Sequence, residues 1–147
     1  MSFTDKIVWI TGASSGIGAA LAKAFAAEGA HIILSGRRTE ALEKVAAGLH
    51  TDSLILPFET TDYNGLPAKV EEAREWKGKI DILINNAGIS QRSLARDTHP
   101  DVHSKIINVD LLAPIWLTQL LLPHMIEAGG GHIVGISSVA GRVGVPL

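Results

Sequence analysis

The chain has 147 residues, a formal net charge of −2 at pH 7, 46% hydrophobic residues and no cysteine. This composition is typical of one folded domain rather than a disordered chain, and the charge argues against a nucleic-acid surface driven by bulk positive charge. Disulfides and thiolate metal sites are excluded, and the six histidines show no metal-ligand spacing, so we expect no metal site. No apolar run approaches the length of a membrane span, and we expect a cytoplasmic protein.

The first predicted unit is a strand, a glycine-rich turn and a helix. Ile7–Ile10 is a short apolar run without polar alternation, which is typical of a buried parallel strand. Residues 11–18 read TGASSGIG, and residues 19–28 are rich in helix formers before a stop at Gly29. A helix N-terminus offers unpaired N–H groups, and glycines let a pyrophosphate approach the backbone. The unit therefore predicts a dinucleotide site, the alternative being a glycine-rich turn without a ligand.

Beyond this unit, predicted strands and helices alternate along the chain. Pro57 cannot donate a ladder hydrogen bond, so we expect the end of the third strand, or one side of it, to lie at an edge of the sheet. The alternation predicts an α/β fold, a doubly wound parallel sheet of Rossmann type with helices on both faces. The further strands are expected at residues 32–35, 54–58, 80–84 and 133–136, and the further helices at residues 39–49, 66–77 and 101–127, with Thr39 as a helix cap.

The helix predicted over residues 101–127 is apolar around most of its circumference. The sheet covers only one side of such a helix, so the other side needs either a further element of the same domain or a second subunit. We expect a homodimer or homotetramer through this helix, with burial inside its own domain as the alternative. The apolar positions are Leu111, Leu112, Ile115, Trp116, Leu117, Leu120, Leu121 and Leu122.

Three motifs follow one another along the chain: TGASSGIG at residues 11–18, NNAG at residues 85–88 and GHIVGISS at residues 131–138. In this order and spacing they resemble the short-chain dehydrogenase/reductase family, from about Lys6 to the last residue. The resemblance implies a nicotinamide dinucleotide, with its pyrophosphate on the glycine turn and its adenosine ribose beside the NNAG segment. The cofactor-binding positions in these motifs are Gly12, Ser14, Ser15, Gly16, Ile17, Gly18, Asn86, Ala87 and Gly88.

The end of the second strand predicts which dinucleotide is preferred. An NAD enzyme places a carboxylate there for the ribose 2′-OH, but this chain has Gly36 followed by Arg37 and Arg38. An arginine supplies a planar, always-charged donor set for a 2′-phosphate, and Ser14 or Ser15 could add a hydroxyl donor. We therefore predict NADP(H) over NAD(H), with Arg37 as the main contact ahead of Arg38. The alternative is that both arginines are solvated loop charges.

The resemblance also implies catalytic positions, and the chain departs from the family pattern near them. Ser138 matches the serine that hydrogen-bonds the substrate carbonyl or alcohol, with strand-end capping as the alternative. Asp110 stands where relatives carry an asparagine that helps to hold a water in a proton relay, and an ionised carboxylate can only accept. Near the adenine, Glu59 replaces the usual aspartate, although backbone contacts from Glu59 and Thr60 could still serve.

The family's acid/base motif, Y-x-x-x-K, would follow Ser138 by more residues than the sequence contains. The single tyrosine, Tyr63, falls in another loop. We therefore expect residues 1–147 to be one truncated NADP-binding domain, incomplete at the C-terminal side of its sheet. The intact protein is predicted to transfer a hydride between NADP(H) and a small carbonyl or secondary alcohol. The alternative is a non-catalytic, redox-sensing dinucleotide-binding protein.

Overall fold

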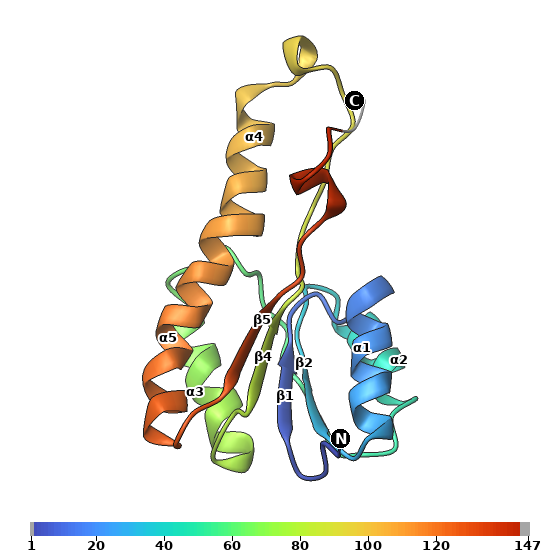
Figure 1. Ribbon diagram of the computed structural model, residues 1–147, viewed down its shortest axis with the longest axis vertical. Coiled ribbons are helices and arrows are strands. Elements are labelled where there is room, and N and C mark those ends of the chain that lie inside the picture. The colour runs from blue at the N-terminus through green and yellow to red at the C-terminus, as the bar shows by residue number, and fades with distance from the viewer. Residues whose placement is uncertain (1, 145–147) are drawn as a thin grey trace.

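The computed structural model describes residues 2–144, which form a five-stranded parallel sheet with helices on both faces (Figure 1). The strand order is β3-β2-β1-β4-β5, so the chain starts in the middle of the sheet and winds outward in both directions. This order confirms the predicted doubly wound, Rossmann-type sheet. The strands are β1 (Ile7–Ile10), β2 (His31–Leu34), β3 (Ser53–Ile55), β4 (Ile82–Asn85) and β5 (His132–Gly135).

The helices cover the two faces of the sheet in pairs. In Figure 1, α1 and α2 lie on one face, and α3 and α5 lie on the other. Successive side chains of a strand point to opposite faces, so each face has its own core. Trp9 and Leu83 pack with Leu117 of α5, whereas Ile10 packs with Leu42 of α2. The helices are α1 (Gly16–Ala27), α2 (Thr39–Ala46), α3 (Leu66–Lys77), α4 (Pro100–Ile107) and α5 (Ala113–Glu127).

Element boundaries differ from the sequence prediction by one to three residues at several ends, and two of these differences bear on specific expectations. Thr39 is the first residue of α2 rather than its cap, since Arg38 occupies the cap position without a side-chain hydrogen bond. The third strand lies at an edge, as expected, but it ends at Ile55, short of Pro57. The backbone still follows the neighbouring strand there, because the N–H of Phe58 donates to the carbonyl of Gly36 at 3.1 Å.

The helix predicted over residues 101–127 is continuous from Pro100 to Glu127, but a π-helical turn, η2 (Asn108–Leu112), separates α4 from α5. α4 extends past the carboxyl ends of the strands (Figure 1). One face of α5 is buried through Ala113, Leu117, Leu121 and Met125. The large apolar side chains that are exposed within residues 2–144 include Leu111, Leu112, Ile115, Trp116, Leu122 and Ile126.

The expectation that no apolar run approaches a membrane span was wrong: Pro100–Glu127 is long and apolar enough to cross a membrane by length and composition alone, with a mean hydropathy of 1.5 in its most apolar window. The core helix of a globular protein passes the same test, and one face of α5 contributes to the core, but only 22% of that window is buried. Within residues 2–144, the outer face of this helix is exposed rather than buried inside its own domain.

Asp81, directly before β4, joins the beginnings of two neighbouring strands. Its carboxylate accepts the backbone N–H of Ile7 at 2.9 Å and hydrogen bonds from Lys6 at 3.0 Å and Lys79 at 2.9 Å. Desolvation works to raise the pKa of Asp81, but the Ile7 N–H and the two ammonium groups outweigh it, so the pKa lies below its ordinary value.

We expect Asp81→Asn to lower the free energy of unfolding at pH 7 by about 1–3 kcal/mol, because hydrogen bonds to a charged acceptor are lost. A carboxyl group with a lowered folded pKa stabilises the protein above its unfolded pKa of about 3.9, and this contribution is lost as the pH falls through the folded value. Denaturant unfolding of both proteins at pH 7 and below pH 4 should therefore show a difference that shrinks in acid. The exposed Asp97→Asn is the matched control, and a difference independent of pH would contradict the assignment.

Candidate cofactor site

The glycine turn between β1 and α1 packs against the end of β4. An added Cβ at Gly18 would lie 2.4 Å from the carbonyl oxygen of Gly12, and one at Gly12 would lie 2.8 Å from the Cα of Ala87. Gly12 and Gly16 have φ values of +64° and +54°, a region that disfavours other residues. An added Cβ at Gly16 would meet no atom within 4 Å, so the outer side of the turn is open.

The side chain of Asn86 holds the end of β4 to this turn. Its Nδ2 donates to the carbonyl oxygens of Thr11 at 3.0 Å and Gly12 at 3.2 Å. In return, Thr11 Oγ1 accepts the backbone N–H groups of Asn86 and Ala87, both at 3.0 Å. Asn86 therefore satisfies backbone groups at a strand end, and the same contacts set the shape of the turn.

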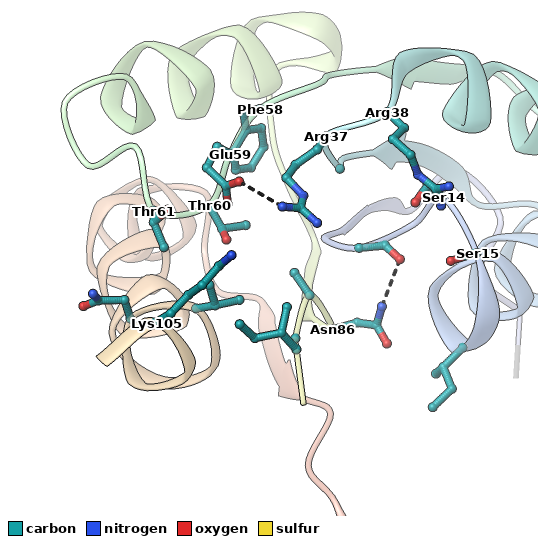
Figure 2. A pocket seen from close by; sticks show the side chains of 18 of the residues that line it. Ser14, Ser15, Arg37, Arg38, Phe58, Glu59, Thr60, Thr61, Asn86 and Lys105 are labelled. Atoms are coloured by element: carbon teal, nitrogen blue, oxygen red, sulfur yellow. Dashed lines mark hydrogen bonds and ion pairs between the residues drawn. The ribbon is translucent and has the colours of Figure 1, made fainter. Parts of the chain in front are cut away.

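A cavity of about 650 Å³ lies between the glycine turn, the ends of β2 and β3, and α4 (Figure 2). It is at the carboxyl ends of the strands, beside the point where the strand order reverses between β1 and β4, which is the usual ligand site of such sheets. Gly16, Gly18 and the catalytic candidates Asp110 and Ser138 are not part of its lining. The predicted cofactor residues that line it are Gly12, Ser14, Ser15, Ile17, Arg37, Arg38, Glu59, Thr60, Asn86, Ala87 and Gly88.

The N-terminus of α1 opens toward this cavity through the glycine turn. Ser15 occupies the cap position of α1, and its side chain makes no capping hydrogen bond. Ser14, Ser15 and Ile17 all line the cavity. The first N–H groups of α1 are therefore not satisfied by that side chain, and they fit an anionic ligand.

Arg37 extends into the cavity from the end of β2 (Figure 2). Its Nη1 lies 3.6 Å from Oε2 of Glu59, and the two side chains are 66% and 43% exposed. No carboxylate occurs at the end of β2, where Gly36 also lines the cavity. Arg37 thus places a positive charge at this position, with Glu59 as its counter-ion.

α4 forms the opposite wall of the cavity, which the sequence motifs did not predict. Lys105 extends from α4 toward the cavity (Figure 2), and no salt bridge joins it to any residue of the described range 2–144. The residues that line the cavity from this side are spaced three and four apart, which places them on one face of the helix. This spacing is visible in the sequence and could have indicated a shared face. The lining positions from α4 and η2 are Asp101, Ser104, Lys105, Asn108 and Val109.

Asp110 lies in the π turn and contacts the loop that follows β4. Its Oδ1 accepts the backbone N–H of Ile89 at 2.9 Å, and an added Cβ at Gly88 would lie 3.5 Å from the same oxygen. The hydroxyl of Tyr63 donates to the carbonyl oxygen of Asn108 at 3.4 Å. Both contacts join the π turn to loops at the carboxyl ends of the strands, so Asp110 acts in this structure as an acceptor that positions the loop.

Ser138 lies three residues after the end of β5, on an exposed segment. Its Oγ accepts the backbone N–H of Ala140 at 3.2 Å, which is the capping role considered above. A hydroxyl group has two acceptor lone pairs and one donor hydrogen, so this contact leaves the hydrogen available to a ligand. Among residues 2–144, no group of three or more His, Asp or Glu side chains has a metal-binding arrangement.

Comparisons with known proteins agree with the motifs and the fold. The family profile described as short chain dehydrogenase matches residues 6–147. The chain is 43% identical to dehydrogenase/reductase SDR family member 7 of Homo sapiens, covering 98% of this chain and 44% of that protein. It is 40% identical to SDR family member 7B of Mus musculus, covering 97% of this chain and 46% of that protein. The chain thus spans about half the length of the curated relatives it matches.

The same similarity appears in three dimensions. The crystal structure of a short-chain dehydrogenase from Streptomyces avermitilis superposes with a TM-score of 0.88 at 33% sequence identity, covering 99% of this chain and 54% of that one. Members of this family are oxidoreductases that use nicotinamide dinucleotides. With a profile match over nearly all of its length, the chain belongs to the short-chain dehydrogenase/reductase family.

Proposed function

We propose that the intact protein is an NADP(H)-dependent oxidoreductase acting on a carbonyl or secondary alcohol. The observation that carries this proposal is one cavity that is lined both by the glycine turn and by Arg37. The dinucleotide would supply the hydride chemistry when bound. The residues of this chain would bind the dinucleotide, orient it and distinguish the form with a 2′-phosphate from the form without one.

The glycine turn fits the pyrophosphate of a dinucleotide. Gly12 and Gly18 leave no space for a Cβ on the side that packs on β4, while Gly16 leaves the outer side open to a ligand. The N-terminal N–H groups of α1 lie at the same place, and Ser15 does not cap them. Backbone donors therefore hold the pyrophosphate, whichever nicotinamide dinucleotide is bound.

Arg37 is proposed to distinguish NADP(H) from NAD(H). Its guanidinium has the charge and the planar donor geometry for a 2′-phosphate, and the end of β2 carries no carboxylate that would repel it. Arg38 lines the same cavity and is proposed as a secondary contact.

The catalytic roles of Ser138 and Asp110 are also proposals. The free hydroxyl hydrogen of Ser138 supports hydrogen bonding to a substrate oxygen. Asp110 supports the site by holding the Ile89 loop. We assign the proton transfer that accompanies hydride transfer to neither of these residues. Tyr63 is not proposed for it either, because its hydroxyl donates to the backbone carbonyl of Asn108. The exposed apolar face of α5 supports a homodimer or homotetramer, and the proposed location is the cytoplasm.

Arg37→Ala should weaken NADPH binding by about one to two orders of magnitude while leaving NADH binding nearly unchanged, because a charge-assisted contact contributes roughly 1.5–3 kcal/mol. Titration of the full-length protein with both cofactors, followed by a dehydrogenase assay with carbonyl and alcohol panels, tests the proposal. Arg96→Ala, an exposed arginine outside the cavity, is the matched control. Equal losses for the two cofactors would refute the NADP(H) preference, and binding without turnover would favour the redox-sensing alternative.

A further inference from the structure

The ion pair between Arg37 and Glu59 lies inside the proposed 2′-phosphate site. Both residues line the cavity, and Figure 2 shows their charged ends turned toward each other. Nη1 and Oε2 are 3.6 Å apart, which is within ion-pair distance but outside hydrogen-bond distance. The guanidinium therefore keeps its hydrogen-bond donors for a ligand while sharing its charge with Glu59.

Among the carboxylates around the cavity, Glu59 is the one that pairs with Arg37. Asp101 also lines the cavity, but it belongs to α4, which forms the wall opposite Arg37. Lys105 faces the cavity from α4, and the salt bridges among residues 2–144 do not include it. Within the described residues, the charge that most directly offsets Arg37 is that of Glu59.

A carboxylate in this position weakens the binding of a 2′-phosphate in two ways. It compensates the charge of Arg37, and it repels the phosphate dianion directly. Both effects are much smaller for a cofactor that carries a neutral 2′-hydroxyl group in place of the phosphate. Because both side chains are well exposed, the ion pair itself contributes little to stability and can open when a ligand binds.

We infer that Glu59 is a specificity-determining residue that weakens the preference for NADP(H) which Arg37 provides. This inference rests on the proposed function of Arg37. It implies that the natural protein discriminates less strongly between the two cofactors than its arginines suggest. The charge of Glu59, rather than its size or its backbone, sets that limit.

Glu59→Gln in the full-length protein tests the inference, because the amide keeps the shape and an acceptor oxygen but removes the charge. We expect the Kd of NADPH to fall by roughly threefold or more, and the Kd of NADH to change by less than about twofold. The gain for NADPH should shrink as salt is raised, since exposed charges are screened. An unchanged ratio of the two Kd values, or weaker NADPH binding, would overturn the inference.

Two control variants separate charge from other effects. Glu43→Gln removes a negative charge from an exposed α2 position outside the cavity, and it should leave both Kd values unchanged. Glu59→Asp keeps the charge, so its ratio of Kd values should stay closer to the natural one than that of Glu59→Gln. A gain for NADPH in Glu43→Gln as large as in Glu59→Gln would show a general charge effect and refute the role of Glu59.

Arg37→Ala separates failure of this inference from failure of the proposed function. If Arg37→Ala loses NADPH selectively and Glu59→Gln changes nothing, the cofactor preference stands and the role of Glu59 is refuted. If Arg37→Ala affects both cofactors equally, the proposed preference itself is refuted. In the double variant, the gain from Glu59→Gln should be smaller than in the natural background, since the arginine that it neutralises is gone.

Discussion

Gly18→Ala is expected to abolish dinucleotide binding, although it adds a single methyl group. The added Cβ would lie 2.4 Å from the carbonyl oxygen of Gly12 and 2.6 Å from Nδ2 of Asn86. The nearest atom belongs to the backbone, so the turn itself must move. The turn then no longer has the backbone conformation that the pyrophosphate needs. Overpacking of this kind also costs about 1–3 kcal/mol of stability, and Gly18→Val should be worse on both counts.

Isothermal titration with NADPH and NADH measures the expected loss, and circular dichroism checks that the helix content is retained. Gly48→Ala is the matched control, because its Cβ would make only ordinary contacts, the nearest at 3.5 Å from the Val45 carbonyl oxygen. Tight binding to folded Gly18→Ala would show that the dinucleotide is held elsewhere.

Ser138→Ala is expected to lower kcat of the full-length enzyme about 10²–10³-fold, as found when one donor to a developing oxyanion is removed. The hydrogen of this hydroxyl is not used by the contact with Ala140, so the proposed role is to donate to the substrate oxygen. The Kd of NADPH should stay nearly constant, because Ser138 is not part of the cavity lining.

Ser137→Ala provides the comparison, since it removes the same group one residue earlier and should affect kcat far less. Steady-state rates and cofactor titrations on both variants separate the chemical step from cofactor binding. Equal effects of the two substitutions on kcat would contradict the assignment of Ser138, and so would a loss in Ser138→Ala that appears only in cofactor affinity.

The strands could be predicted from the sequence because local physics determines them. β1, β2 and β4 are apolar runs buried on both faces, and each ends close to a residue suited to a turn. The π turn at Asn108–Leu112 could not be predicted, because the contacts that accompany it come from distant segments. Tyr63 reaches it from the loop before α3, and Ile89 reaches it from the loop after β4.

The same distinction applies to the cavity. The glycine turn and the NNAG segment are contiguous motifs, and the structure brings their residues together as expected. The wall from α4 was missed because a polar helix face becomes a cavity wall only through the packing of the chain. Likewise, the pairing of Arg37 with Glu59 joins the ends of two neighbouring strands, and no local pattern indicates that these side chains meet.

The central position of β1 has a consequence for protein synthesis. β1 is made before the other four strands of this sheet and pairs with β2 soon afterwards. Its other edge stays unpaired until β4 is made, and the contact between Ile7 and Asp81 joins residues 74 positions apart. Until β4 has left the ribosome, the nascent chain presents an unpaired apolar edge that other chains can bind. Translation that pauses before residue 82 would thus prolong exposure of a strand that the finished protein buries completely.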